Sequence, residues 1–238
     1  MTGPDSTPAD LRDGLIAGLR AARATERAIF AAYEPTERDA PAADGGWSPK
    51  DVLAHLGAWR RHQADRLAAR REGRDEAAFP AGETDEINAV LHAERAGWSW
   101  DRVLADATAA TELLIVEIEV AADETLANDR MVGSIMGNGP EHDLAHLPAL
   151  AARVGLEERI AALAGDVAAA VDSGGLPTRA AAYARYNLAC FHALAGRLDE
   201  ARALLRVALP ASDELRAFAP DDGDLVALRD ELPDLMGG

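Results

Sequence analysis

Two of the six histidines stand four residues apart, in the segment PEHDLAHLPALAARVG. Side chains at positions i and i+4 of a helix project from one face about one turn apart, so His142 and His146 can grip the same cation. A third histidine, His55, lies beside the apolar stripe of another helical segment, GWSPKDVLAHLGAW. Three neutral imidazoles leave an ion such as Zn²⁺ with open coordination positions, as a catalytic centre requires. The sequence therefore predicts a metal site formed by His55, His142 and His146.

Each of these residues also has a simpler interpretation. A pair of histidines four apart is often an incidental feature of a helix surface, and a lone histidine on an apolar stripe is often a satisfied core residue. Trp47 and Trp59 could line a pocket near His55, although inward aromatic residues commonly belong to the core. Asn88 could orient a ligand or a histidine, or could simply lie on a helix surface. The sequence context of the histidines favours the metal site.

The remaining reactive residues are predicted to be structural or exposed. His62 follows His55 by seven residues and could approach the rim of the same pocket, but we expect His62 and His92 to be surface residues. Cys190 stands among apolar neighbours with no basic pair, which indicates a buried structural thiol. The Gly-Asn-Gly sequence at 137–139 lacks the preceding strand and the following lysine of a phosphate loop.

These side chains must be positioned by helices, because the chain is rich in alanine and only 5% aromatic, which favours an all-α fold. Four amphipathic segments predict an antiparallel four-helix bundle. The expected elements are a helix over 8–33, a second from the Ser48 cap to Gly73, a third region over 85–120 divided at 97–100, an irregular connection over 122–139, and a fourth helix from Pro140 with a break at Pro148.

From about residue 156 the sequence becomes rich in alanine. The segment 177–209 resembles one tetratricopeptide unit, with small residues at Ala189, Ala201 and Ala208 and an inter-helix turn at Gly196. A single unit cannot bury its own face, so neighbouring helices must cover it. We therefore expect two domains, a bundle over 1–155 and a tetratricopeptide-like region over 156–238. The second region could bind a protein partner or could cap the bundle.

The net charge of −17 argues against a nucleic-acid partner. Acidic residues interrupt the densest group of basic residues, so we interpret that group as a solvated helix face; its members are Arg60, Arg61, Arg66, Arg70, Arg71 and Arg74. A single cysteine suits a reducing compartment, and neither an export signal nor a run of 18 apolar residues is present. These features predict a cytoplasmic protein that does not enter a membrane.

The sequence from Gly46 to Trp59 resembles the second-helix signature of the DinB/YfiT-like superfamily, in particular the branch of ClbS/DfsB-type four-helix bundle proteins. A Trp-Ser start precedes a Leu-x-His-Leu core, and a second tryptophan follows the histidine by four residues. The resemblance covers roughly residues 8–155, and Asn88, Asn138, His142 and His146 fall where that superfamily places comparable residues. It implies a bundle with a metal held by His55, His142 and His146.

The resemblance implies several activities rather than one. Members include thiol-dependent transferases and isomerases that use mycothiol, bacillithiol or glutathione, and resistance proteins that act on electrophilic toxins. We expect a divalent ion (Zn, Ni or Fe) and a low-molecular-weight thiol, with an electrophilic small molecule as substrate. Two alternatives stay open: a metal-dependent hydrolase in toxin resistance, and a non-catalytic binding protein that uses its tetratricopeptide-like segment. Bundles of this kind often pair, so the chain could also form a homodimer.

Overall fold

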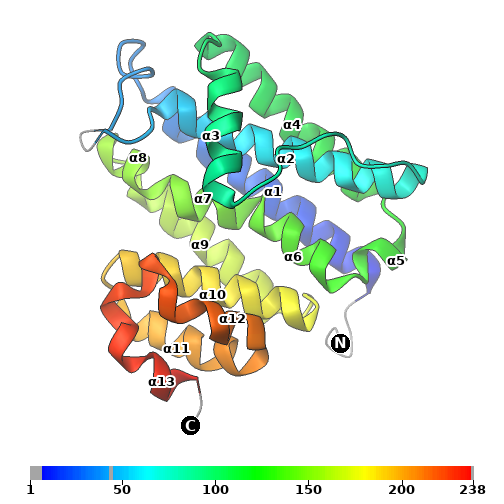
Figure 1. Ribbon diagram of the computed structural model, residues 1–238, viewed down its shortest axis with the longest axis vertical. Helices are drawn as coiled ribbons and strands as arrows, with labels where there is room; N and C mark the ends of the chain where they lie inside the picture. Colours follow the sequence, from blue (N-terminus) through cyan, green and yellow to red (C-terminus); the bar gives the residue numbers. More distant parts are fainter. Residues whose placement is uncertain (1–6, 43–44, 237–238) are drawn as a thin grey trace.

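The computed structural model describes residues 7–42 and 45–236. All regular secondary structure within these ranges is helical, as the composition predicts (Figure 1). The first six residues of the expected bundle, and residues 43 and 44 in the break after its first helix, lie outside them. The elements are α1 (Pro8–Ala31), α2 (Pro49–Glu72), α3 (Thr84–Arg95), α4 (Trp100–Val120), α5 (Asp123–Leu126), α6 (Asp129–Gly137), α7 (Pro140–His146), α8 (Pro148–Arg153), α9 (Glu157–Asp172), α10 (Thr178–Leu194), α11 (Leu198–Ala208), η1 (Leu209–Ala211), α12 (Asp213–Phe218), η2 (Ala219–Asp221), η3 (Gly223–Glu231) and α13 (Leu232–Leu235).

Local capping explains where the long N-terminal helices begin and end. The Ser48 side chain accepts a hydrogen bond from the Asp51 amide, and the Asp51 carboxylate in turn accepts one from the Ser48 amide. This reciprocal pair satisfies two backbone donors that helix geometry leaves free. At the other end Gly73 adopts a left-handed φ of 66°, which glycine tolerates without steric penalty. The predicted limits of this helix are confirmed.

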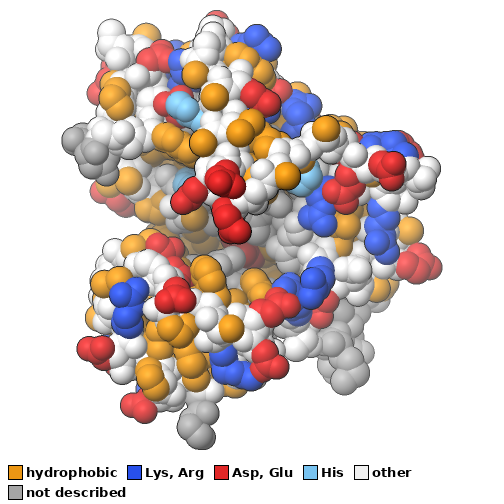
Figure 2. Space-filling model, viewed as in Figure 1, with side chains coloured by type: hydrophobic (Ala, Val, Ile, Leu, Met, Phe, Trp, Pro, Cys, Tyr) orange, Lys and Arg blue, Asp and Glu red, His pale blue; other side chains and the backbone are white. Residues whose placement is uncertain are grey.

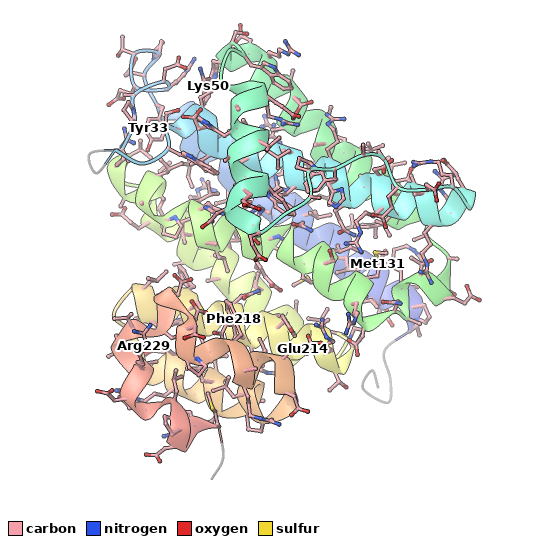
Figure 3. All side chains as sticks on the ribbon, viewed as in Figure 1. Tyr33, Lys50, Met131, Glu214, Phe218 and Arg229 are labelled. Atoms are coloured by element: carbon pink, nitrogen blue, oxygen red, sulfur yellow. The ribbon has the colours of Figure 1, made fainter. Side chains whose placement is uncertain are left out.

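The region 85–120 divides as expected. Helix α3 ends at Arg95, and α4 begins at Trp100 with Ser99 as its cap, because the Ser99 hydroxyl accepts from the Arg102 amide. Pro148 also interrupts the fourth predicted helix, which the structure resolves into α7 and α8. The Tyr33 hydroxyl donates to the Leu150 carbonyl at 2.8 Å, so the segment after α1 is fixed to α8 (Figure 3).

The prediction of an irregular connection over 122–139 is wrong. Two short helices, α5 and α6, occupy most of it, and the Asn128 side chain caps α6. Gly133 and Gly137 have low helix propensity, but tertiary packing overrides it in α6. Helix α6 buries Met131, Val132, Ile135 and Met136 on one face, and it packs against α10.

Two hydrophobic cores lie side by side and share α10. The larger core joins apolar residues of α1, α2 and α4 to those of α6–α10, so it continues past residue 155 through Ile160, Leu163 and Val167. The division of the chain after residue 155 stays a prediction. Helix α1 contacts α4, α7 and α9, whereas α2 contacts α3, α4 and α7. These contacts place α2 and α7, the helices that carry the three histidines, against each other.

The smaller core lies between α10, α11 and the C-terminal turns. Ala189, Ala201 and Ala208 are fully buried there, and Gly196 turns the chain with a φ of 73°. The tail covers this helix pair through Leu225 and Leu228 of η3, which contacts both α10 and α11. The helix pair is therefore covered by neighbours, as its apolar faces require. Its assignment as a tetratricopeptide unit stays a prediction.

One residue of the basic group lies in the interior, where the interpretation as a solvated face is wrong. Arg60 is fully buried, and its guanidinium forms ion pairs with Glu26 of α1 and Asp143 of α7. It also donates to the Thr111 hydroxyl of α4 at 3.3 Å. Burial and the adjacent Glu26 carboxylate raise the pKa of Asp143 well above its usual range, although Arg60 opposes the shift. Arg23 of α1 also pairs with Glu26, at 3.1 Å, so two guanidinium groups face the two carboxyl groups of this cluster.

Within the described ranges, no helix combines the length and the apolar character that a membrane crossing requires.

Replacing Arg60 tests the importance of this buried cluster. We expect Arg60→Ala to lower the free energy of unfolding by about 3–5 kcal/mol, because the two carboxyl groups lose their buried partner. The control is Arg70→Ala, an exposed arginine of the same helix, which should change stability by less than about 0.5 kcal/mol. Urea denaturation followed by circular dichroism measures both. Equal stability of the two variants would contradict the interpretation.

Candidate metal centre

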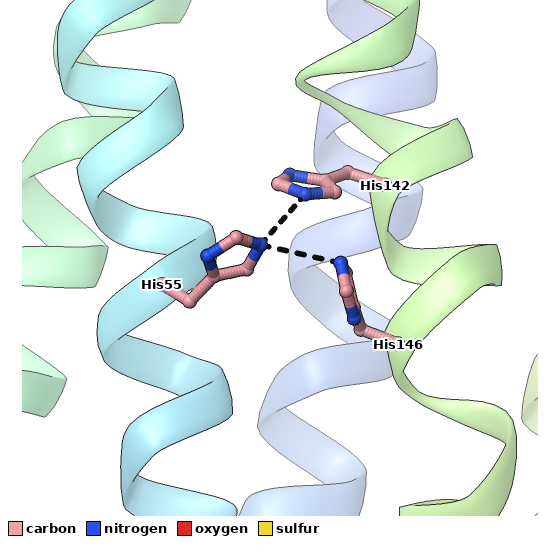
Figure 4. A group of neighbouring side chains, drawn as sticks. All are labelled: His55, His142 and His146. Carbon is pink, nitrogen blue, oxygen red and sulfur yellow. Dashed lines mark hydrogen bonds between the residues drawn. The ribbon is translucent and has the colours of Figure 1, made fainter. Parts of the chain in front are cut away.

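The three predicted histidines meet between α2 and α7. The Nε2 atom of His55 lies 2.9 Å from Nε2 of His142 and 3.2 Å from Nε2 of His146 (Figure 4). One ligand atom from each residue falls within 4.8 Å of the other two, so the group could hold a metal ion. The i, i+4 spacing on α7 and the position of His55 on α2 thus bring together the residues that the sequence singled out.

Packing around each helix fixes these rings. On α2, Leu53 and Leu56 are fully buried on either side of His55, so the helix cannot rotate without exposing them. Helix α7 is short and is bounded by Pro140 and Pro148 at its two ends. Pro140 at its first position loses no helix hydrogen bond, whereas Pro148, two residues after His146, prevents α7 from continuing. Both imidazoles of α7 therefore lie about one turn apart on a short helix with firm limits.

The protonation state of the cluster suits a cation. Burial lowers the pKa of His55 to about 3, and the neighbouring His146 adds to the effect. Burial also lowers the pKa of His146, and it lowers that of His142 far below the usual value. All three rings are therefore neutral near pH 7 and can each present a lone pair.

The spacing of the nitrogens fits a zinc-like ion. Ligand nitrogens at about 2.0–2.1 Å from a tetrahedral ion lie about 3.3 Å apart, close to the two distances found here. The Nδ1 atoms of His55 and His142 are buried and have no hydrogen-bond partner in the part of the chain described. Acceptors commonly orient such rings in metal sites. Here the orientation comes from ring packing instead, with the Trp47 ring centroid 4.8 Å from that of His55.

Both tryptophans that flank His55 line the cluster. The Trp59 centroid lies 6.4 Å from those of His55 and His142, and its indole N–H donates to Asn88 Oδ1 at 3.0 Å. Asn88 thus orients a tryptophan rather than a histidine, and it is half-buried. These aromatic rings surround the imidazoles with apolar surface and limit the access of water.

The two remaining histidines of this region lie outside the cluster. His92 is half-buried, stacks on Trp47 at 5.8 Å and places Nε2 3.3 Å from Asp51 Oδ1. His62 is also half-buried and stacks on Phe79, with ring centroids 3.7 Å apart. We expected both histidines to be surface residues, but neither is fully exposed. Both rings extend the aromatic wall around the cluster.

Helix α3 covers the cluster with few contacts of its own. Leu91 is its single buried residue, and it packs mainly against α2. The space enclosed beneath it, lined by His55, Asn88 and His92, measures about 10 Å³. Such a space holds no more than one water molecule. A substrate could reach His55 from this side only after α3 moves.

A larger cleft reaches the cluster from its other side. It measures about 250 Å³, separates α7 from the C-terminal helices, and is lined by His142, Glu141 and Asn187 among others. The hollow between the two parts of the molecule is visible in Figure 2. Phe218, 58% exposed, lies on the C-terminal wall (Figure 3). This cleft has room for a small substrate next to His142.

Glu141 is a buried acid that the sequence analysis did not single out. Its side chain accepts a hydrogen bond from Asn187, its second oxygen has no partner in the described structure, and burial raises its pKa to about 7. A single sequence offers little signal for it, because 41 acidic residues are present and α10, which supplies Asn187, is distant along the chain.

Cys190 is buried in the same cleft, as predicted. Burial and the carboxylates of Asp222 and Asp224 raise the pKa of its thiol, so the sulfur stays protonated. Cys190, Asp222 and Asp224 are close enough to hold an ion, but Asp222 already accepts hydrogen bonds from the Tyr186 hydroxyl at 2.6 Å and from the thiol at 3.6 Å. These bonds account for the group as a structural contact.

The lowered histidine pKa values predict acid sensitivity of the metal-free protein. The unfolded chain takes up protons near pH 6.5, whereas folded His55 takes one up only near pH 3. Stability is therefore lost as the pH falls from about 6.5 toward 3, at up to about 1.4 kcal/mol per pH unit for each such histidine. His55→Leu should reduce this slope by about one proton in urea titrations at several pH values. If the stability of His55→Leu and of the wild type depended equally on pH, burial would not lower the pKa of His55.

The geometry also predicts stoichiometric metal binding. Protein purified without an affinity tag should bind one Zn²⁺ per chain, and His142→Ala or His146→Ala should weaken binding by more than about 100-fold. Elemental analysis and isothermal titration calorimetry measure both effects. The control is His192→Ala, on α10 and outside the cluster, which should bind as the wild type does. Retention of one tight ion by His142→Ala would exclude this cluster as the site.

No family model, no curated protein and no solved structure matches this chain. Membership of the DinB/YfiT-like superfamily therefore stays a prediction from the segment around His55. The geometry of the histidine cluster, which does not depend on that resemblance, carries the functional argument.

Proposed function

We propose that this protein is a metal-dependent enzyme that joins a low-molecular-weight thiol to an electrophilic small molecule. The observation that carries the proposal is the convergence of three neutral imidazole nitrogens, with Nε2 separations of 2.9 and 3.2 Å from His55. A divalent ion bound by three protein ligands keeps a free coordination position, and coordination there converts a thiol into the nucleophilic thiolate near neutral pH.

The chain's own residues support a nucleophile that comes from solution. Its single cysteine, Cys190, is held as a protonated thiol by burial and by two carboxylates, so it is a poor nucleophile. The tryptophans around His55 limit water in the site, which favours a thiol over hydroxide as the attacking group. The cleft beside His142 offers a place for the electrophile, with aromatic side chains of the C-terminal helices opposite.

The helix arrangement is compatible with the fold that this function implies. Helices α1 and α2 each contact both α4 and α7 around the larger core, and we assign these four helices to an antiparallel bundle of the DinB/YfiT type. The helix pair α10–α11 is assigned to a tetratricopeptide-like hairpin whose first helix, α10, lines the cleft, and this hairpin could also bind a protein partner. A cytoplasmic location and a homodimer belong to the same proposal.

The activity can be tested with 1-chloro-2,4-dinitrobenzene, from which a thiolate displaces chloride to give a coloured thioether. Zinc-loaded protein should accelerate this reaction with one or more of glutathione, mycothiol and bacillithiol. His146→Ala should lose more than about 90% of the rate, because the metal is no longer held. Absorbance of the thioether measures the rate, and His192→Ala serves as the control.

The same assay distinguishes thiol transfer from the two alternatives, hydrolysis and non-catalytic binding. Consumption of the electrophile without added thiol would favour the hydrolase and contradict thiol transfer. Stoichiometric zinc with no acceleration by any of the three thiols, on this probe or on an epoxide probe, would contradict the enzyme proposal and favour a binding protein.

A further inference from the structure

A cavity lies between α1, the loop that follows it and α4, which contribute no histidine to the metal cluster. It measures about 530 Å³, within the range of about 300–1,000 Å³ typical of small-molecule sites. Its apolar surface comes from Phe30, Trp100 and Leu104, and its polar surface includes Arg23, Arg27 and Arg38. Nothing in the proposed thiol chemistry uses this cavity.

The apolar surface is suited to a flat ring. Phe30 is buried and meets Trp100 edge-on, with ring centroids 6.1 Å apart and an angle of 64°. Trp100 and Leu104 are only half-buried, so part of each side chain remains free to contact a ligand. An aromatic ring stacked in this position would bury apolar surface that now faces water.

The cationic side chains are unusual in so acidic a chain. Arg27 is exposed and has no hydrogen bond or ion pair within the described ranges. Arg38 lies over Trp100, 4.8 Å from the ring centroid, and uses only its Nε atom, which donates to the Tyr33 carbonyl. Three arginines and a single glutamate, Glu112, line the cavity, although the whole chain carries 41 acidic and 24 basic residues.

Two other arginines of α1 do have carboxylate partners. Arg12 pairs with Asp123 at 2.8 Å, and Arg20 approaches Glu119 at 3.8 Å. The first is an ion pair between α1 and the start of α5, and the second is one between α1 and the end of α4. Arg27 and Arg38 have no carboxylate partner in the described structure, and both guanidinium groups belong to the lining of one cavity. Their charge is therefore available to a ligand.

We propose that this cavity binds a small aromatic anion. The ring would lie against Trp100 and Leu104, and a carboxylate, sulfonate or phosphate would lie between Arg27 and Arg38. Guanidinium groups form strong, directional hydrogen bonds to such anions. The proposal does not depend on the metal centre.

The probe for this site is 1-anilinonaphthalene-8-sulfonate, compared with N-phenyl-1-naphthylamine, which has the same rings and lacks the sulfonate. Fluorescence titration of the full-length protein should give one bound sulfonate probe per chain. It should bind at least about tenfold more tightly than the neutral amine, and increasing salt should reduce that difference. Equal affinities for the two probes would overturn the proposal.

Variants locate the binding. The double substitution Arg27→Gln, Arg38→Gln should weaken the sulfonate probe at least about tenfold and change the neutral probe less than about twofold. Trp100→Leu should weaken both probes, because both use the ring surface. The matched control is Arg70→Gln, Arg159→Gln, which changes the net charge equally at two exposed arginines without described partners.

Two further outcomes would overturn the site. One is an equal loss of affinity in the test and control double variants, which would reflect overall charge alone. The other is an unchanged affinity of the sulfonate probe in Arg27→Gln, Arg38→Gln. Circular dichroism and the Tm establish that each variant is folded. An unchanged zinc content of the test variant would show that any loss of probe binding is separate from the metal centre.

Discussion

The buried guanidinium of Arg60 joins four helices through one side chain. It extends from α2, forms ion pairs with Glu26 of α1 and Asp143 of α7, and donates to Thr111 of α4. An unpaired charge in the interior is strongly unfavourable, so the arrangement is stable only when all of these partners are in place. Helix packing and charge neutralisation therefore depend on each other.

This constraint also acts on the histidine cluster. Asp143 directly follows His142 on α7, and Arg60 lies five residues after His55 on α2, a rise of about 7.5 Å along that helix. The ion pair thus joins the same two helices that supply the imidazoles, a short distance from them. Any change in the spacing of α2 and α7 would disturb both the ion pair and the Nε2 separations. We therefore expect the charged cluster to help position the three imidazoles.

Local signals in the sequence were sufficient for most helices and for the three histidines. Ser48, Ser99 and Gly73 mark helix ends through hydrogen bonds and backbone angles that act within a few residues. The i, i+4 pair on α7 shares a face by helix geometry alone. Such signals are readable because their physical causes are local in the chain.

Other features required tertiary information. Arg60 is a charged residue, so a periodic pattern of apolar residues does not place it in the core. Its burial depends on two carboxyl groups that are 34 and 83 residues away along the chain. Helix α6 forms in a glycine-containing segment because α10 covers its apolar face. The arginine-lined cavity brings residues of α1, α4 and the loop after α1 together. In each case the deciding partner is remote in sequence, so no local pattern could reveal it.

We expect His55, His142 and His146 to bind one metal ion together. X-ray absorption spectroscopy at the zinc edge, on protein loaded with one equivalent of Zn²⁺, can identify the ligands of the ion. The spectrum should show three imidazole ligands at about 2.0–2.1 Å plus one lighter ligand from solvent, and His55→Ala should lose one imidazole contribution. A spectrum that lacks imidazole scattering, or one unchanged in His55→Ala, would contradict this expectation.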